Sequence, residues 1–293
     1  MGNDLVKGSA LMLVTTLLFS ISDTMAKYIT ATVPVAMLLA IRYGIFLSMA
    51  CLMLAWNRPV SVRSRRPAVQ MIRGLGVVGS GITFIIALRY LPIAEATAIN
   101  FITPLVVTLL AVPVLGETVR PQGWAAVVLG FCGMLVVVRP GSGGMHPAAL
   151  LVVVSSLFWG MSILATRRLA AIDRPAVTVF WTATTGFIVA LSALPFFLHR
   201  LTLREALLCL TIGVISSTAQ YTAVQAYRFA RASVLAPLSY VQLIWASALG
   251  YVVFGSLPDR YVVAGAAVIA ASGLYVLQLE RQRQGDKSLA ATD

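Results

Sequence analysis

The chain has 293 residues, of which 59% are hydrophobic and only 11% are charged. Soluble proteins carry about 25% charged residues, so this composition excludes a soluble globular protein and predicts an integral membrane protein. The basic residues number 22 against 10 acidic ones, a net charge of +12 that would indicate a nucleic-acid partner in a soluble domain. Three cysteines without C-x-x-C spacing predict neither a disulfide framework nor a metal site, and no cofactor is expected.

Ten apolar segments in chain order are long enough to cross a bilayer, which requires about 20 mostly apolar residues. The first half contains residues 8–29, 34–56, 69–90, 94–115 and 122–138. The second half contains residues 147–166, 175–198, 205–227, 234–254 and 261–279. Because these segments are continuously apolar rather than alternating, the sequence predicts an all-α integral membrane protein with ten transmembrane helices.

The basic residues are distributed unequally between the two sides of this arrangement. If the N-terminus is cytoplasmic, 15 of the 22 Lys and Arg residues fall on the cytoplasmic side. Positive charges in short loops favour the cytoplasm, so both termini are predicted to be cytoplasmic. The excess of Arg over Lys is typical of bacterial genes rich in GC, which indicates a bacterial inner membrane. The net charge is thereby explained as an orientation signal, and no nucleic-acid partner is expected.

The two halves of the chain are similar to each other at an offset of 139 residues. This offset pairs Leu18 with Leu157, Gly74 with Gly213, Thr83 with Thr222 and Gly116 with Gly255. The predicted repeats are residues 1–139 and 140–293, each with five spans. Because five is odd, the second repeat is inverted relative to the first, and inverted repeats let one bundle open to either side of a central site, as transporters do.

Several short motifs follow one another in a characteristic order. They are Lys27 in span one, Arg42-Tyr43 in span two, Ala87-Leu88-Arg89-Tyr90-Leu91-Pro92 followed by Glu95-Ala96, the tract from Pro104 to Gly116-Glu117, and Phe158-Trp159-Gly160. This order resembles the drug/metabolite transporter superfamily, in its ten-helix EamA-type branch. The chain departs from the family pattern at residues 19–21, where Phe-Ser-Ile replaces Trp-Gly, and at Ser256, which stands where the first half has an acid.

The resemblance implies ten helices around a central cavity and small metabolites as substrates, among them amino acids, vitamins, nucleotide sugars and cationic drugs. Among bacterial members, the chain resembles YddG-type exporters of aromatic amino acids. Carriers of vitamins or S-adenosylmethionine share much of the same pattern, so these substrates stay open.

Few ionisable residues lie inside the predicted spans. A charge at the centre of a membrane helix costs roughly 2.5–3.5 kcal/mol, so each one needs a reason. Asp23 and Arg42 lie about 9 and about 12 Å from the same membrane face, which predicts a pair. Lys27 follows Asp23 on the same helical face, and Glu95 begins span four. We predict coupling or gating roles for these four residues, with a structural cluster in which Lys27 snorkels as the alternative.

Polar and aromatic residues inside the spans indicate the lining of a cavity. A polar amide in lipid must face a partner or water, so such residues are expected to point inward. The predicted lining is Phe84, Asn100, Thr103, Trp159, Ser162, Gln220, Tyr221, Tyr240, Gln242 and Trp245. Hydrogen bonding between helices is the alternative role for each amide.

Small residues, prolines and terminal arginines predict local features of the helices. Glycines 74, 76, 79 and 81 of span three predict either close approach to a neighbouring helix or a bend. Pro104 and Pro113 are expected to interrupt span four. Small residues in span ten predict tight packing against its own bundle or a second protomer. Arg73 and Arg89, at the ends of span three, are expected to extend toward the membrane surface.

Three other functions fit the sequence less well than transport. An intramembrane enzyme would need a catalytic motif, but there is no H-E-x-x-H and no histidine inside a span. A channel would need more polar residues inside the spans, and a scaffold would not need an inverted repeat. We therefore predict a secondary transporter that works by alternating access, foremost an amino acid exporter. An importer or exchanger of a vitamin or S-adenosylmethionine is the alternative, and the sequence leaves monomer and homodimer open.

Overall fold

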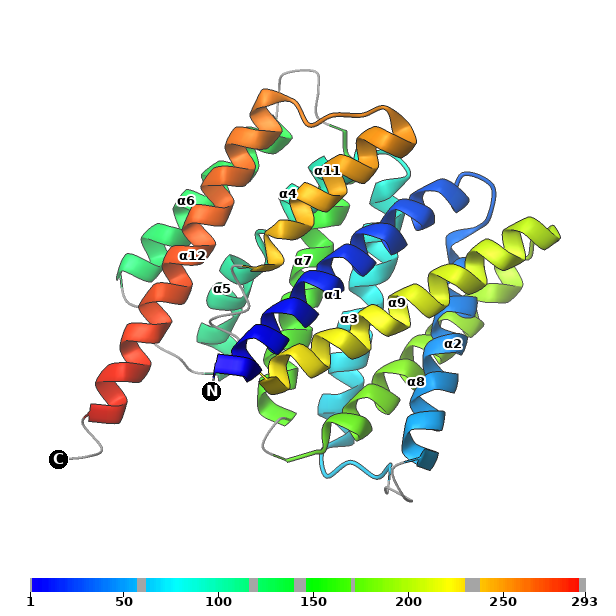
Figure 1. Ribbon diagram of the computed structural model, residues 1–293, viewed down its shortest axis with the longest axis horizontal. Helices are drawn as coiled ribbons and strands as arrows, with labels where there is room; N and C mark the ends of the chain where they lie inside the picture. Colours follow the sequence, from blue (N-terminus) through cyan, green and yellow to red (C-terminus); the bar gives the residue numbers. More distant parts are fainter. Residues whose placement is uncertain are drawn as a thin grey trace.

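The computed structural model describes residues 2–56, 62–115, 121–139, 146–169, 172–229 and 238–289, and its regular structure there is entirely helical. The helices are α1 (Gly2–Ile29), α2 (Val35–Trp56), α3 (Pro67–Leu88), α4 (Ile93–Asn100), α5 (Thr103–Leu115), α6 (Pro121–Val138), α7 (Ala148–Leu169), α8 (Pro175–Ala193), the short 3₁₀ helix η1 (Leu194–Phe196), α9 (Leu203–Phe229), α11 (Val241–Phe254) and α12 (Arg260–Leu289). Figure 1 shows one helical bundle in which the N- and C-termini lie at the same end.

The ten predicted spans are confirmed in the described part of the chain. Eight helical segments are long and apolar enough to cross a membrane, one of them formed by α4 and α5 together over Ile93–Pro113. The remaining two are shorter apolar helices, α11 and the segment Arg260–Tyr275 of α12. The largest difference in a boundary is at α12, which runs to Leu289 instead of residue 279, because the polar residues beyond the apolar segment are mostly good helix formers.

The fourth span is broken in its middle. Pro104 has no N–H to donate to the Asn100 carbonyl, so the helical hydrogen bond at this point is missing. The Thr103 hydroxyl donates to that carbonyl instead, at 2.7 Å. The helix therefore ends at Asn100 and begins again at Thr103, so the interruption lies just before Pro104. The prediction that Pro113 also interrupts this span is wrong, because α5 continues past Pro113 to Leu115.

In the equivalent span of the second half, the helix α11 begins close to the position that matches the start of α5. Tyr240 precedes α11 as its N-cap, and Phe101 follows α4 as its C-cap. The offset of 139 residues that relates the two halves also relates Phe101 to Tyr240. Their rings meet edge to face, with centroids 4.9 Å apart. The two helix ends thus meet inside the bundle, where transporters of inverted-repeat design place their substrate sites.

The packing of the helices follows the same internal relation. The helix α3 packs along α7 as α1 packs along α9, and α2 packs on α9 as α3 packs on α8. The pairs α2–α8 and α6–α12 join equivalent spans of the two halves, and Figure 1 shows α6 and α12 side by side at one edge of the bundle. When spans one to five are swapped with spans six to ten, α3–α7 exchanges with α1–α9 and α2–α9 exchanges with α3–α8. The pairs α2–α8 and α6–α12 map onto themselves. The predicted boundary after residue 139 adjoins residues outside the described part of the chain.

Glycines bring several of these helices close together. A Cβ atom on Gly76 of α3 would lie 2.8 Å from the backbone oxygen of Phe158 in α7. At the α6–α12 contact, a Cβ atom on Gly265 would lie 2.6 Å from the backbone oxygen of Gly133. The sequence predicted either close approach or a bend for the glycines of span three. Close approach is observed at Gly76, and α3 is one uninterrupted helix. In span ten, Gly265 and Gly273 are buried in the bundle, whereas Ala264, Ala267 and Ala271 are exposed.

Candidate functional site

A cavity of about 180 Å³ lies between the two halves of the bundle, and we call it the central cavity. Its walls come from α1, α2, α3, α4, α7, α9 and α11. Its lining combines aromatic rings, hydroxyls and amides with one acidic and one basic residue: Phe19, Asp23, Arg42, Tyr43, Phe46, Val77, Ser80, Gly81, Phe84, Ile85, Thr97, Asn100, Phe101, Ser155, Trp159, Ser216, Ser217, Gln220 and Gln242. Such a mixture can hold a small amphipathic molecule by ring contacts and a few directed polar contacts.

Half of the residues predicted from sequence as cavity lining lie in this wall. They are Phe84, Asn100, Trp159, Gln220 and Gln242. Two of the four residues predicted to couple or gate, Asp23 and Arg42, lie there as well. The structure therefore brings together residues from both halves that are up to about two hundred positions apart in the chain.

The other five residues lie outside the wall of the central cavity. Thr103 bonds the broken helix end described above, and Ser162 is buried on α7 beside Gly76. Tyr221 is 39% exposed and accepts a hydrogen bond from the Gln225 side chain. The Tyr240 ring contacts Phe101, and the Trp245 indole nitrogen is buried without a hydrogen-bond partner in the described part of the chain.

Asp23 and Arg42 face the same cavity without forming a direct ion pair. Their opposite charges interact, yet no carboxylate oxygen of Asp23 lies within 4.0 Å of the Arg42 guanidinium in the structure. This differs from the predicted pair, because depth along a helix fixes the height of a residue but not the direction of its side chain. Both charges are consequently left able to contact a ligand.

Hydrogen bonds between hydroxyls and amides fix the wall of the cavity. The Ser156 hydroxyl donates to Asn100 Oδ1 at 3.1 Å, which joins α7 to α4 and leaves the NH2 group of Asn100 for other partners. The hydroxyls of Ser80 and Ser155 lie 2.9 Å apart and join α3 to α7. The Ser217 hydroxyl, in contrast, is buried without a hydrogen-bond partner in the described chain. A buried polar atom of this kind is satisfied when a ligand or water occupies the cavity.

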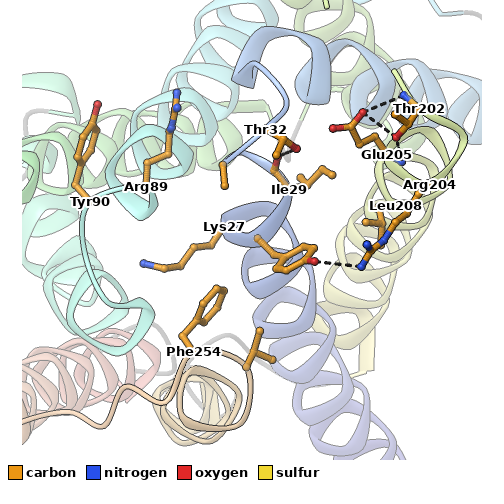
Figure 2. A pocket seen from close by; sticks show the side chains of 13 residues that line it. Lys27, Ile29, Thr32, Arg89, Tyr90, Thr202, Arg204, Glu205, Leu208 and Phe254 are labelled. Atoms are coloured by element: carbon orange, nitrogen blue, oxygen red, sulfur yellow. Dashed lines mark hydrogen bonds between the residues drawn. The ribbon is translucent and has the colours of Figure 1, made fainter. Parts of the chain in front are cut away.

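A larger cavity of about 810 Å³ lies where α1, α3 and α11 end and α9 begins, at the far end of α1 from the N-terminus. Figure 2 shows this cavity from close by. We call it the Lys27 vestibule; its lining is Lys27, Tyr28, Ile29, Ala31, Thr32, Arg89, Tyr90, Thr202, Arg204, Glu205, Leu208, Val253 and Phe254. The Lys27 ammonium donates to the Leu91 carbonyl and lies 5.4 Å from the centroid of the Phe254 ring. Asp23 precedes Lys27 by one helical turn, so the two cavities meet α1 one turn apart.

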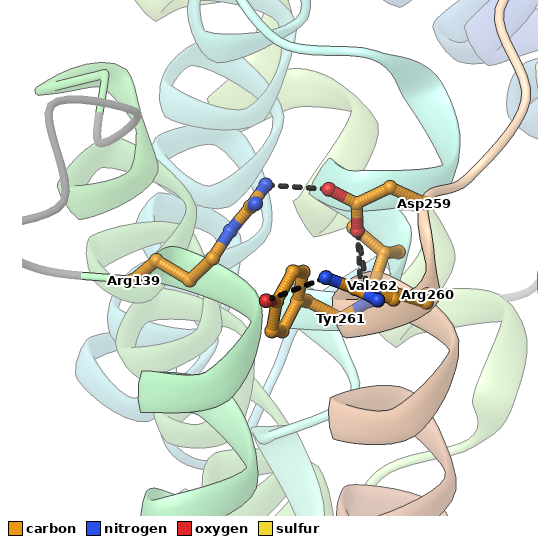
Figure 3. A network of polar contacts seen from close by, with 5 residues as sticks. All are labelled: Arg139, Asp259, Arg260, Tyr261 and Val262. Carbon is orange, nitrogen blue, oxygen red and sulfur yellow. Dashed lines mark hydrogen bonds and ion pairs between the residues drawn. The ribbon is translucent and has the colours of Figure 1, made fainter.

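Glu95, the fourth residue predicted to couple or gate, lines neither cavity and is half-buried. Its charge interacts with those of Arg139 and Asp259. These two residues form the ion pair that joins α6 to α12, in which Arg139 Nη2 is 2.6 Å from Asp259 Oδ2 (Figure 3). The backbone N–H of Val262 donates to Asp259 at 2.8 Å and, together with the nearby Arg139 charge, holds the pKa of Asp259 below its ordinary value. Because both partners of the ion pair are partly exposed, it contributes only about 0–1 kcal/mol.

A second polar cluster ties α3 to the turn between α7 and α8, at the end of the bundle that carries the termini. The Asp173 carboxylate accepts hydrogen bonds from the Ser64 hydroxyl, from Gln70 Nε2 at 2.8 Å and from the Arg65 backbone N–H at 3.2 Å. Partial burial raises the pKa of Asp173, but these hydrogen bonds together lower it further, so the net pKa lies below the ordinary value of 3.8. We call Ser64, Gln70 and Asp173 the Asp173 cluster.

Arg73 strengthens the same contact between helices. Its guanidinium donates to the hydroxyls of Thr166, at 2.8 Å, and Thr182. The expectation that Arg73 extends toward the membrane surface is therefore wrong, because these hydroxyls on α7 and α8 hold it inside the bundle. Arg89 is exposed and lines the Lys27 vestibule.

The Asp173 cluster predicts a loss of stability in acid. Because the pKa of Asp173 is lower in the folded than in the unfolded protein, its stabilising effect is complete above the unfolded pKa and is lost as the pH falls through the folded pKa, below 3.8. We expect the Tm of the wild type in detergent to fall more steeply below this pH than that of Asp173→Asn. The charge control is Asp286→Asn, near the end of the chain. Equal slopes for Asp173→Asn and the wild type would contradict this role.

Sequence comparison places the chain among membrane transporters. The EamA-like transporter family matches residues 6–139 and again residues 146–278. A riboflavin transporter of Rhizobium johnstonii is 32% identical over 213 residues, which cover 69% of this chain and 67% of the relative. A pseudopaline exporter of Pseudomonas aeruginosa is 27% identical over 288 residues, covering 96% and 99%. An S-adenosylmethionine uptake transporter of Rickettsia prowazekii is 24% identical over 271 residues, covering 92% and 91%.

A solved crystal structure has the same fold. It superimposes with a TM-score of 0.62 over 96% of this chain and 99% of the other, at 23% sequence identity. At this identity the match concerns the fold alone. The comparisons agree with the ten-helix arrangement and with a small-molecule substrate that crosses a membrane.

Proposed function

Because the chain belongs to the EamA-like transporter family of the drug/metabolite transporter superfamily, we propose that it is a secondary transporter that exports an amino acid by alternating access. The observation that carries this proposal is the placement of Asp23 and Arg42 in the wall of one small cavity without a direct ion pair. The relatives are named as transporters, which sets this function apart from an enzyme or a scaffold.

The two charges match the two charged groups of a free amino acid. An Arg guanidinium presents a planar fork of N–H donors that fits a carboxylate, so Arg42 is suited to the substrate carboxylate. The Asp23 carboxylate accepts hydrogen bonds from an ammonium group. The rings of Phe19, Phe84 and Trp159 line the same cavity and are suited to an apolar or aromatic side chain.

The volume of the central cavity also favours a small substrate. At about 180 Å³ it is smaller than the roughly 300–1,000 Å³ of pockets for drug-sized ligands. This favours a molecule of amino-acid size over riboflavin or S-adenosylmethionine. Riboflavin is the second candidate, because the riboflavin transporter of Rhizobium johnstonii is 32% identical and the cavity wall is rich in aromatic rings.

The proposed orientation places both termini in the cytoplasm of a bacterial cell with the protein in its inner membrane. Support comes from the 15 of 22 basic residues that then fall on the cytoplasmic side. The Lys27 vestibule consequently opens to the outside, and the Asp173 cluster holds the cytoplasmic ends of α3, α7 and α8 together. Residues 1–139 and 140–293 act as the two inverted repeats whose relative movement opens one side or the other.

A panel of substrates in liposomes tests the function. Purified protein is reconstituted into vesicles loaded with labelled phenylalanine, leucine, glutamate, lysine, riboflavin or S-adenosylmethionine, and efflux is followed with and without a pH gradient. We expect efflux of at least one amino acid well above that of protein-free vesicles. Uptake experiments with external substrate compare the opposite direction, and the pH gradient tests proton coupling.

The outcomes of the panel separate the candidates. Efflux of riboflavin without efflux of any amino acid would replace the first candidate by the second. Transport of an amino acid only when it is supplied outside would identify an importer. Fluxes equal to those of protein-free vesicles for every compound would refute both candidates.

A further inference from the structure

Three basic side chains of the Lys27 vestibule have no acidic partner. Lys27, Arg89 and Arg204 line one cavity of about 810 Å³. None of the three has a carboxylate oxygen within 4.0 Å among the residues that the structure describes. Figure 2 shows that they come from three elements, with Lys27 on α1, Arg204 on α9 and Arg89 at the end of α3. Unpaired charges of one sign in a concave site focus the electrostatic potential and attract the opposite charge.

Two of these groups are held by neutral partners alone. The Lys27 ammonium donates to the Leu91 carbonyl and lies over the Phe254 ring. The Arg204 guanidinium donates to the Tyr28 hydroxyl at 3.2 Å. A hydrogen bond between a cation and an anion is stronger than one between a cation and a neutral acceptor. An incoming anion can therefore replace these partners without leaving a carboxylate unpaired.

The acidic residue of the vestibule, Glu205, is engaged at the start of α9. Its Oε2 atom accepts hydrogen bonds from the backbone N–H and the hydroxyl of Thr202, both at 2.9 Å. The Glu205 N–H faces the Thr202 hydroxyl at 3.3 Å, which completes the capping box of a helix N-terminus. His199 Nε2 lies 3.7 Å from the same carboxylate. Glu95 acts on Lys27 electrostatically but does not line the vestibule.

We propose that the Lys27 vestibule is a binding site for a small organic anion that carries a carboxylate or phosphate group. The site is distinct from the central cavity and does not depend on which metabolite that cavity holds. Arg89 and Arg204 offer forked donors, and Lys27 offers a point charge. Tyr28, Tyr90 and Phe254 supply aromatic surface for the remainder of the ligand. The volume falls within the roughly 300–1,000 Å³ of small-molecule sites.

Lys27 connects this site to the central cavity. Its partner Leu91 lies in the turn between α3 and α4, and α4 ends at Asn100 in the wall of the central cavity. Asp23, one turn before Lys27 on α1, lies in the same wall. An anion that takes the Lys27 ammonium from Leu91 changes the contact of α1 with this turn. Anion binding and substrate binding are therefore coupled, and by thermodynamic linkage each changes the affinity for the other equally.

The proposal is tested by direct binding to the full-length protein in phosphatidylcholine nanodiscs. Isothermal titration calorimetry is carried out with citrate and with inorganic phosphate as the probes. We expect saturable citrate binding to the wild type, weakened about tenfold or more in Arg204→Gln and in Arg89→Gln. The matched control is Arg260→Gln, which makes the same charge change at the same end of the bundle outside the vestibule. Unchanged Tm values and elution volumes establish that the variants are folded.

Nanodiscs that contain phosphatidylglycerol distinguish the two sources of the anion. If lipid headgroups occupy the site, citrate binding to the wild type is weaker in phosphatidylglycerol than in phosphatidylcholine, and Arg204→Gln shows a smaller difference. If the site takes a soluble anion, the wild-type affinity is the same in both lipids. Either result supports the anion site. No saturable binding of citrate or phosphate in either lipid, or equal weakening in Arg260→Gln, would overturn it.

The same nanodiscs separate this proposal from the proposed function. Citrate binding that depends on Arg89 and Arg204, without binding of any amino acid, would retain the anion site and refute the amino acid substrate. Amino acid binding without citrate binding would retain the amino acid substrate and refute the anion site. Where both bind, a change in citrate affinity caused by a saturating amino acid measures the coupling through Lys27.

Discussion

Arg42→Gln is expected to weaken the binding of a transported amino acid about thirtyfold or more, and to lower its efflux from proteoliposomes to near that of protein-free vesicles. Removal of one partner from a buried, hydrogen-bonded charge pair costs about 2–5 kcal/mol, and about 1.4 kcal/mol corresponds to a tenfold change in Kd. Glutamine keeps a hydrogen-bond donor and a polar side chain but is two bonds shorter and uncharged. The loss is therefore a loss of charge and of the guanidinium fork.

Three further variants place this effect at the central cavity. Arg42→Lys keeps the charge without the fork and is expected to bind at an intermediate affinity. Asp23→Asn removes the negative charge that faces the substrate ammonium and, with it, any pH dependence of transport that arises from this carboxylate. Arg200→Gln changes an arginine that lines neither cavity and is the matched control. Binding by Arg42→Gln that equals that of the wild type would remove Arg42 from the substrate site.

The opposite charges in the central cavity illustrate what the sequence could and could not predict. Apolar segment lengths fix the number of spans, and the rise per residue along a helix fixes the height of each side chain, so Asp23 and Arg42 could be placed at one level. Whether two side chains at one level touch depends on the rotation and separation of their helices. Neither quantity can be read from a single apolar segment, in which nearly every position is apolar and the helical period is weak.

The role of a polar residue inside a span also depends on how the helices pack, because its side chain can either bond to its own helix or face the cavity. Thr103 and Asn100 have similar neighbours in the sequence, but the Thr103 hydroxyl is used by the helix break that Pro104 causes, and Asn100 faces the central cavity. A local pattern, proline one position after threonine, could have indicated that use. For Asp173 and Gln70 there is no such local signal, because the two residues are about a hundred positions apart and meet only when α3 packs on the α7–α8 turn.

Gly76→Ala is expected to destabilise the protein, although alanine is the better helix former. The new Cβ atom would lie 2.8 Å from the backbone oxygen of Phe158, which cannot rotate away as a flexible side chain can. The helices α3 and α7 must separate, and overpacking of this kind typically costs about 1–3 kcal/mol. The hydroxyl contact between Ser80 and Ser155, one turn further along the same pair of helices, would be stretched by this movement.

Gly81→Ala is the matched control, on the same helix and with the same change in composition. A Cβ atom at this position would lie 3.5 Å from the Tyr43 hydroxyl, an ordinary contact distance. Without a clash, replacement of a glycine inside a helix by alanine stabilises by roughly 0.5–1 kcal/mol. Measured as Tm in the same detergent, the two variants should shift in opposite directions. Equal shifts would mean that the new Cβ atom at residue 76 is accommodated at little cost, which would contradict the close approach of α3 and α7 at Gly76 as the source of the effect.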